Sequence, residues 1–195
     1  MIDKRVIKTK TNIKNTLKKL ILDKPYEKIT VTEICNVAKT SRITFYTYYD
    51  DKNSVVEEIF DDYMKEATKD YYILEEKNNK EKSPIKGYYN VLDAILDLYY
   101  NNLEFFAYTN SFINPYLYSS FYSHTFTIAT NYIEKHSNDF KPKYSTKLTA
   151  ILICNSLWGV INEFHANNVD EEEVRKSVRS IYADILNSAI FTIVK

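Results

Sequence analysis

The sequence predicts an all-α fold of about nine helices, and three observations lead to this prediction. Apolar residues recur at intervals of three and four along most of the chain, and no long segment alternates with a period of two. Only 2 glycines and 4 prolines occur in 195 residues, which favours long uninterrupted helices over a many-turned β-fold. With 45% hydrophobic and 27% charged residues, the composition is that of a globular protein rather than a disordered tail.

The first helices have recognisable ends. Pro25 ends the first helix, because proline cannot continue it. Thr30 and Glu33 have capping-box spacing, in which the threonine hydroxyl accepts from the Glu33 amide and the Glu33 side chain reaches back. The expected starts of the later helices are Ser41, Asp50 or Asp51, Ser83, Asn102, Asn114, Ser145 and Asp170. Residues 75–82 and 136–143 are expected to be loops, and the last helix is expected to run to about Ile193.

Charge divides the chain in two. Residues 1–54 carry 12 Lys+Arg and 6 Asp+Glu, a net charge of +6, whereas residues 55–195 carry 14 and 20, a net charge of −6. A basic head on an acidic body indicates that the head meets a polyanion, although chance clustering on a solvated helix is an alternative.

The segment Ile29–Val56 has the spacing of a helix-turn-helix, in which the second helix enters the major groove of DNA. Two short helices are joined by residues 39–41. Arg42 can bind guanine and Ile43 can touch a thymine methyl group, although Arg42 could also be a plain surface arginine. The predicted DNA-contacting residues are Lys8, Lys10, Thr30, Arg42, Ile43, Thr44, Tyr46, Thr47, Tyr48 and Lys52, the tyrosines and Lys52 through phosphates.

This segment resembles the head of the tetracycline-repressor (TetR) family of transcriptional regulators over about residues 7–56. The matching places are Ile29-Thr30-Val31, Ile34-Cys35, Ala38-Lys39-Thr40-Ser41, Thr44-Phe45-Tyr46, Tyr48-Tyr49 and Lys52. Lys39 departs from the family pattern, since a turn glycine is usual at its place, and Cys35 replaces a small alanine. The resemblance implies a DNA-binding domain at 1–54 and an effector-binding and dimerisation domain at 55–195.

Aromatic residues are concentrated in the middle of the chain, where 14 of 29 lie between Ile85 and Tyr132. In a TetR-like body, the corresponding helices enclose an effector cavity, although an aromatic stripe at helical spacing also fits a filled core. The candidates to line such a cavity are Tyr88, Tyr99, Phe105, Phe112, Tyr116, Phe121 and Tyr122.

The last two helices are strongly apolar and are expected to pair with a second copy. Gly159 lies mid-helix, where glycine costs about 1 kcal/mol relative to alanine, and a closely approaching partner helix would explain it. The candidate interface residues are Leu157, Trp158, Gly159, Ile161, Val178, Ile181 and Ile185. The alternative is that these helices only cover the core of their own chain.

Several classes of protein are disfavoured. The histidines lack metal-ligand spacing, and neither a G-x-S-x-G motif nor a phosphate loop occurs, so no metal, cofactor or enzymatic activity is expected. Cys35 and Cys154 are expected to be buried, reduced thiols of a cytoplasmic protein. No signal peptide is recognisable, and the most apolar window, 148–161, is too short to span a membrane.

The resemblance therefore implies a homodimeric repressor that binds double-stranded operator DNA and is released by a small-molecule effector. The alternative is a co-regulator or activator that acts mainly through protein–protein contacts. This alternative arises because the last two helices look similar to a branch that contains dihydroxyacetone-kinase operon regulators.

Overall fold

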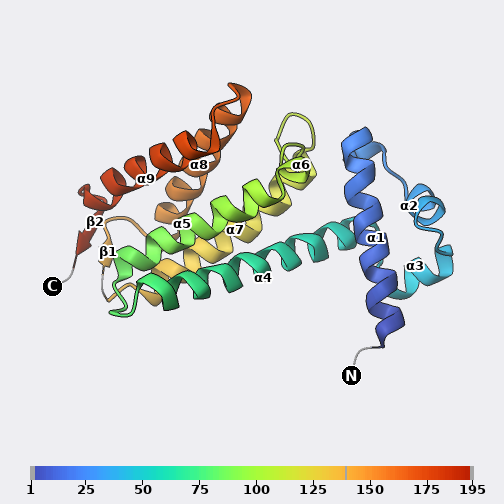
Figure 1. The fold of residues 1–195 in the computed structure, drawn as a ribbon, viewed down its shortest axis with the longest axis horizontal. Helices are drawn as coiled ribbons and strands as arrows, with labels where there is room; N and C mark the ends of the chain where they lie inside the picture. Colours follow the sequence, from blue (N-terminus) through green and yellow to red (C-terminus); the bar gives the residue numbers. More distant parts are fainter. Residues whose placement is uncertain (1–2, 139, 194–195) are drawn as a thin grey trace. The chain divides into compact units, whose positions relative to one another are not determined.

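The computed structural model describes residues 3–138 and 140–193, and nine α-helices in these ranges confirm the all-α prediction (Figure 1). The helices are α1 (Lys4–Asp23), α2 (Val31–Val37), α3 (Arg42–Tyr48), α4 (Lys52–Asn78), α5 (Pro84–Asn101), α6 (Leu103–Phe106), α7 (Pro115–Lys135), α8 (Thr146–Ala166) and α9 (Glu171–Asn187). A 3-10 helix, η1 (Tyr26–Lys28), connects α1 to α2. Strands β1 (Phe140–Pro142) and β2 (Phe191–Ile193) form an antiparallel pair.

The chain forms two compact units, one made of residues 3–63 and 102–121, the other of the described residues in 64–101 and 122–193. Helices α4 and α7 contribute to both, because each begins in the first unit and ends in the second. The expected boundary after Ser54 lies inside the first unit, since the first turns of α4 pack there. The functional division of the chain at that point stays a prediction.

The core of the first unit lies between α1, the two short helices and the start of α4. Leu17 of α1, Ile34 of α2 and Phe45 of α3 are fully buried. A second layer of aromatic rings joins α4 to α6 and α7, with Phe60 stacked on Phe121 at 5.3 Å between ring centroids. Buried apolar side chains thus join α1, α2 and α3 within the first unit.

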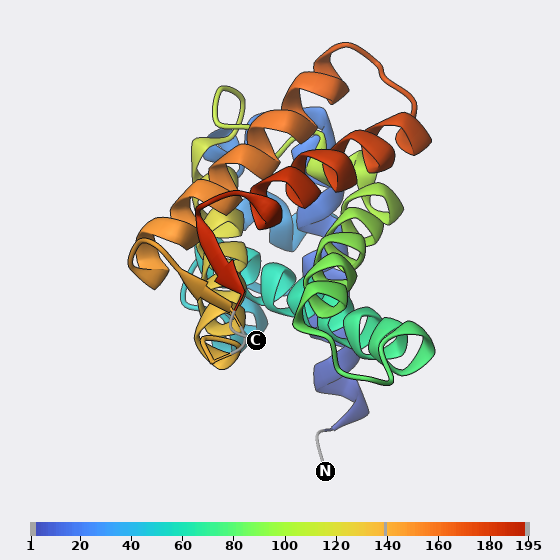
Figure 2. The same cartoon turned by 90° about the vertical axis from the view of Figure 1, so that its left-hand side faces the viewer.

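In the second unit, α8 and α9 form a hairpin and lie side by side (Figure 2). The helix α9 also packs on α5, where Arg175 forms an ion pair with Asp97 at 2.8 Å. Val178 and Tyr182 of α9 are fully buried in this contact layer. None of the described helices combines the length and the hydrophobicity that crossing a bilayer requires.

Most predicted helix starts are correct, because their side chains cap the helix as expected. Thr30, Ser41, Asp51, Ser145 and Asp170 each accept a hydrogen bond from a backbone amide in the first turn that follows. The Thr30 cap forms only half of a capping box, since the Glu33 carboxylate instead binds Lys24 Nζ at 2.6 Å.

Three predicted boundaries are wrong. The helix α4 continues to Asn78 into the expected loop, and α6 ends at Phe106 instead of about Phe112. The helix α9 ends at Asn187, after which Ser188 turns the chain and β2 pairs with β1. The expected loop before α8 and the expected last helical turns thus form a small sheet.

Candidate functional site

The short helix α3 presents a continuous exposed face. Ile43 is 84% exposed and Tyr46 is 49% exposed, and Arg42 and Thr47 also lie on the surface. These four positions are one turn apart in pairs, so they share one side of the helix. Phe45 is fully buried on the opposite side. The exposed isoleucine and the neighbouring arginine give this face one apolar and one cationic group. Groups of these two kinds contact the edges of DNA bases in the major groove.

Hydrogen bonds define the turn that precedes α3. The Thr40 amide donates to the Cys35 carbonyl at 2.9 Å, which closes a Schellman motif at the end of α2. Lys39 occupies the left-handed position of this motif, with φ of 50°. Asn12 of α1 donates to the Ala38 carbonyl at 2.6 Å and pins the turn from the other side.

The backbone at Lys39 shows how the chain accommodates a lysine at a place where the family pattern has a glycine. The backbone adopts the left-handed conformation that a glycine would take, at a steric cost, rather than another turn. The Lys39 side chain is exposed beside a polar surface hollow between α1 and the turn, which Lys8, Thr9 and Asn12 also line. The hollow brings two cationic side chains, from Lys8 and Lys39, to one surface.

The Lys52 ammonium is engaged within the first unit, and its predicted phosphate contact stays a prediction. Its Nζ donates to the carbonyl oxygens of Tyr26, Glu27 and Ile29 at 2.8, 3.2 and 2.8 Å, which uses all three ammonium protons. The ammonium also lies 4.3 Å from the centroid of the Tyr26 ring. Burial lowers the pKa of Lys52. Lys52 therefore fixes η1 and the start of α2.

Lys10 is likewise engaged inside the unit, whereas Lys8 is exposed. Lys10 forms an ion pair with Glu58 of α4 at 2.5 Å and lies 5.1 Å from the Tyr49 ring centroid. Burial alone would raise the pKa of Glu58, but hydrogen bonds from Lys10 and Lys14 hold it below its ordinary value. Lys10 therefore connects α1 to α4, and its predicted DNA contact stays a prediction.

The remaining predicted contact residues have local partners. Thr30 is the cap of α2, and the Thr44 hydroxyl lies 2.8 Å from that of Ser41. The Thr47 hydroxyl donates to the Ile43 carbonyl, which leaves its oxygen as an acceptor toward the surface. Tyr48 is half-buried. The exposed base-reading candidates are thus Arg42, Ile43, Tyr46 and Thr47.

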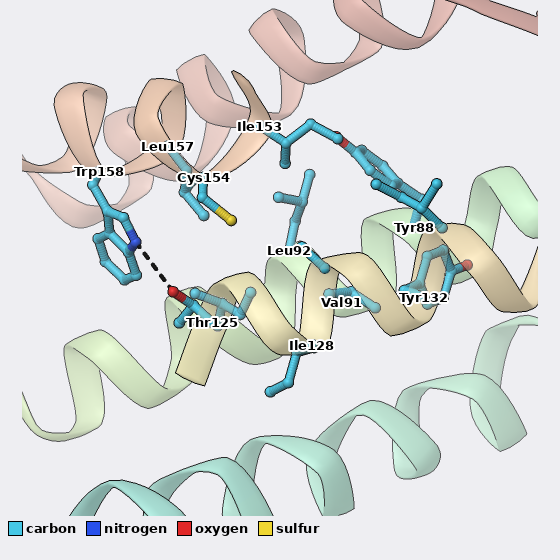
Figure 3. Close-up of a pocket in the computed structure, with 13 residues that line it drawn as sticks. Tyr88, Val91, Leu92, Thr125, Ile128, Tyr132, Ile153, Cys154, Leu157 and Trp158 are labelled. Carbon is cyan, nitrogen blue, oxygen red and sulfur yellow. Dashed lines mark hydrogen bonds between the residues drawn. The ribbon is translucent and has the colours of Figure 1, made fainter. Parts of the chain in front are cut away.

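A cavity of about 40 Å³ lies in the second unit, between α5, α7 and α8 (Figure 3). Its lining is almost wholly apolar, from residues such as Leu92, Ile128, Ile153 and Trp158. The Trp158 indole donates to the Thr125 hydroxyl at 3.4 Å on one wall. Cys154 also lines the cavity, and burial raises the pKa of its thiol to about 12, so it stays protonated.

A larger groove of about 310 Å³ lies on the other side of α5 and α7 in the same unit. Residues 67–72 of α4 supply its outer wall, and Lys135 supplies a charge at its edge. Val91, Ile95, Ile128 and Tyr132 line both the groove and the cavity. These four side chains, which we call the partition, therefore separate two neighbouring spaces.

Two bacterial proteins are among the solved structures with a similar arrangement of helices. A protein described as a TetR-family transcriptional regulator, from Syntrophomonas wolfei str. Goettingen, is similar with a TM-score of 0.72, over 93% of this chain and 96% of that one, at 15% identity. Another, from Shewanella sp. PV-4, is similar with a TM-score of 0.68, over 89% and 95% of the two chains, at 13% identity. The chain has the TetR fold.

At the level of sequence, the similarity is confined to a short segment. YxbF, an uncharacterised HTH-type transcriptional regulator of Bacillus subtilis strain 168, is 42% identical over 55 residues. This match covers 28% of the chain and only 14% of YxbF. No protein-family model matches the chain.

In this TetR fold, six of the seven predicted cavity residues lie elsewhere, and only Tyr88 lines the cavity. Phe105 and Phe121 fill the aromatic core of the first unit, where both pack on Phe60. Phe112 is 97% exposed in the α6–α7 connection.

The other three candidates are engaged in packing. Tyr116 stacks on Tyr26 at 5.3 Å and its hydroxyl donates to Glu57 at 2.9 Å, both in the first unit. Tyr99 is buried away from the cavity and the groove, and Tyr122 stacks on Phe126 at 6.1 Å. The residues that line this cavity are mostly aliphatic, so a search for aromatic residues did not find them.

Of the residues predicted to form a dimer interface, some are buried in their own chain and others are exposed. Leu157, Trp158, Ile161 and Val178 are at least 96% buried within their own chain, which is the alternative considered for them. Leu157 and Trp158 line the cavity between α5, α7 and α8, and Val178 lies on α9, which packs on α5. Gly159 lies on the surface, and a Cβ added there would meet no atom within 4 Å.

Ile181 and Ile185 of α9 are part-exposed at i and i+4. On α8, Leu148 and Leu152 are 57% and 42% exposed, and they continue toward Gly159 on the same helical face. Of the residues predicted to form the dimer interface, only Gly159, Ile181 and Ile185 thus lie on the exposed surface of the two helices.

Proposed function

We propose that the chain is a DNA-binding transcriptional regulator of the TetR type, most simply a homodimeric repressor released from its operator by a small molecule. The observation that carries the proposal is the exposed face of α3. Its side chains point to solvent and do not pack in the core; they are Arg42, Ile43, Tyr46 and Thr47. An isoleucine that is 84% exposed on a short helix has no packing role, whereas contact with a thymine methyl group would give it one.

Charge supports the same proposal. The +6 head opposes the −6 remainder of the chain, so a polyanion is attracted to the head and repelled by the rest. Several of the cations are engaged in ion pairs or hydrogen bonds, but Lys8, Lys39 and Arg42 are exposed. Exposed cations of this kind fit phosphate and guanine contacts.

A second copy would place two α3 helices on one DNA. We propose that the dimer forms along the exposed apolar stripe of α8, with Leu148, Leu152 and Gly159, together with Ile181 and Ile185 of α9. Two helices from each chain would make an isologous four-helix interface. The recognition helices of the dimer would then contact half-sites about one helical turn, roughly 34–36 Å, apart.

Gly159→Leu tests this interface cleanly. The added side chain has open space in the single chain, and leucine favours helix by about 0.8 kcal/mol over glycine, so each protomer should fold at least as stably. A partner helix packed on bare backbone would be forced away, at about 1–3 kcal/mol for each copy. Sedimentation should show a wild-type dimer and a monomeric variant. A dimeric Gly159→Leu variant that binds DNA normally would move the interface elsewhere.

Effector control is proposed from the cavity and the groove, which offer an apolar site in the body. The helix α7 supplies a possible link, because its first residues pack on η1 and its later residues line the cavity. A ligand that prefers one placement of α7 would bias the head by population shift. An activator that acts through protein contacts is the alternative function, and the same helices allow it.

The test is a gel shift on fragments upstream of the chain's own gene, with random DNA of equal length as competitor. Specific binding that weakens steeply with salt supports the proposal. The matched variants are Arg42→Ala on the exposed face of α3 and Arg175→Ala on α9 as a control in the second unit. Equal binding to operator fragments and random DNA would exclude a sequence-specific regulator.

A further inference from the structure

Tyr88, one of the residues that line the cavity, has a hydroxyl without a hydrogen-bond partner in the described part of the chain. The Tyr88 hydroxyl is buried, and no hydrogen bond to it is found among the described residues. Figure 3 shows this side chain at the edge of the cavity with its oxygen turned toward α8, near Ile153. A buried hydroxyl without a partner is unfavourable, and an acceptor brought in by a ligand would relieve it.

The neighbouring hydroxyls donate to backbone carbonyls, and none of them is hydrogen-bonded to Tyr88. The Tyr182 hydroxyl donates to the Ile153 carbonyl at 2.7 Å, and the Tyr132 hydroxyl donates to the Pro84 carbonyl at 3.0 Å. The Thr125 hydroxyl donates to the Tyr122 carbonyl at 3.0 Å. Burial raises the pKa of Tyr88 well above its ordinary value, so the hydroxyl keeps its proton and acts as a donor. The missing partner is therefore an acceptor.

The chemistry of the walls limits what can carry that acceptor. No Asp, Glu, Lys, Arg or His is among the residues that line the cavity, and the groove offers a single cation, Lys135, at its edge. An ionised group drawn into such a lining would lose its hydration without gaining a counter-ion. A hydrocarbon would fill the space but leave Tyr88 unsatisfied.

Size requires the two spaces to act together. A cavity that holds benzene measures about 150 Å³, so the inner cavity of about 40 Å³ admits only a small group by itself. The groove of about 310 Å³ is large enough for a ring or a short chain. Because the partition is made of side chains alone, a change of rotamer at Ile95 or Ile128 would join the two spaces.

We propose that the groove and the cavity together bind a neutral, mainly apolar molecule with one hydrogen-bond acceptor, such as a ketone or an ester, which accepts a hydrogen bond from Tyr88. The body of the ligand lies in the groove, and its acceptor end passes the partition. This inference rests on the proposed function only for its regulatory meaning, since binding itself is measured without DNA.

Three probes of nearly equal size test the proposal on the full chain. Acetophenone has a neutral acceptor, ethylbenzene has none, and benzoate carries a charge. Binding is measured by ligand-observed NMR titration. We expect acetophenone to bind about tenfold more tightly than ethylbenzene, as one neutral hydrogen bond predicts, and benzoate to bind most weakly.

Two variants locate the effect. Tyr88→Phe removes only the hydroxyl and should bring acetophenone and ethylbenzene to equal affinity. Tyr89→Phe is the matched control on the same helix, since Tyr89 lines neither space, and it should keep the tenfold preference. Ile128→Trp fills the partition and should weaken both neutral probes.

Each other outcome overturns the proposal. Equal affinity for the two neutral probes in the wild type, a preference that survives Tyr88→Phe, tighter binding of benzoate, or no binding of any probe all contradict it. A gel shift with acetophenone separates the two hypotheses. Ketone binding without any operator binding would refute the proposed function and leave the ligand site intact, whereas operator binding without probe binding would do the opposite.

Discussion

Replacing Lys39 with glycine should make the protein more stable and its DNA binding weaker. Lys39 is the left-handed residue of the Schellman motif between α2 and α3, with φ of 50°. A side chain there crowds the following carbonyl, which glycine avoids. The same side chain is exposed beside Lys8 on the surface of the proposed DNA-binding head. The two effects of one substitution therefore have opposite signs.

The magnitudes follow from the geometry. A non-glycine residue in the left-handed region costs about 1–2 kcal/mol, and glycine returns part of this through the entropy of the unfolded chain, so a net gain of about 1 kcal/mol is expected. For a chain of this size that gain raises the midpoint of thermal unfolding by about 2–4 °C. Loss of one phosphate contact per protomer should reduce the salt slope of DNA binding by about 0.9, or about twice that in a dimer.

The measurements are thermal unfolding by circular dichroism and operator titrations at several salt concentrations. Lys82→Gly is a matched control, since Lys82 has φ of 56° and lies in the α4–α5 connection. It should raise stability without changing DNA binding. Lys39→Asn keeps a residue that tolerates the left-handed region but removes the charge, so it should lose affinity like Lys39→Gly.

Two results would refute the reasoning separately. A lower midpoint for Lys39→Gly would show that the turn is not strained by its lysine. A higher midpoint with an unchanged salt slope would show that the strain is real but that the Lys39 ammonium does not meet phosphate.

Three further predictions concern single side chains of the first unit. Arg42→Ala should cost about 1–3 kcal/mol on the operator and much less on random DNA in competition gel shifts, and equal losses would remove Arg42 from base reading. Asn114→Ala should lower the free energy of unfolding by about 2–3 kcal/mol in urea titrations. The reason is that the buried Asn114 side chain accepts a hydrogen bond from the Tyr26 amide at 2.7 Å and donates one to the Tyr108 carbonyl at 2.8 Å. A loss under about 1 kcal/mol would show that water replaces the side chain. Burial would raise the pKa of Glu58, but hydrogen bonds from Lys10 and Lys14 hold this pKa below 4.5 in the folded protein. The ionised Glu58 carboxylate therefore stabilises the fold above pH 4.5, and this stabilisation is lost as the pH falls through the pKa of the folded state. Glu58→Gln should therefore flatten the acid limb of stability, measured by urea unfolding from about pH 7 to pH 3, and an unchanged limb would assign acid unfolding to other carboxylates.

The helix starts could be predicted from sequence because capping is a local interaction. Ser41 and Asp170 accept from amides within the next three residues, so the sequence itself contains both partners. Asn114 shows the limit of this reasoning. Its position before Pro115 suggested a cap, but its side chain binds Tyr26, which is 88 residues away. Long-range partners of a polar side chain cannot be read from its neighbours in sequence.

The end of α9 was missed for a similar reason. The apolar repeat continues to Ile193, but Phe191–Ile193 pairs with Phe140–Pro142 as a strand. A short apolar run fits either state, and the partner strand decides between them. The partner strand lies in the polar segment 136–143, which contains one phenylalanine and one proline. This segment has no alternation of apolar and polar residues from which a strand could be predicted.

Functional faces were harder to predict than helices, because periodicity identifies a stripe without showing what covers it. On α8, the most apolar residues, such as Leu157 and Ile161, are buried against the same chain, while the more mixed stripe of Leu148, Leu152 and Gly159 is exposed. The same inversion occurs at the cavity, where large aromatic rings fill space and smaller aliphatic residues leave it open. Residues with the strongest hydrophobic signal are those a single chain buries first. Candidate surfaces for partners or ligands are therefore better sought among apolar residues of intermediate signal that lie beside a glycine or an unpaired hydroxyl.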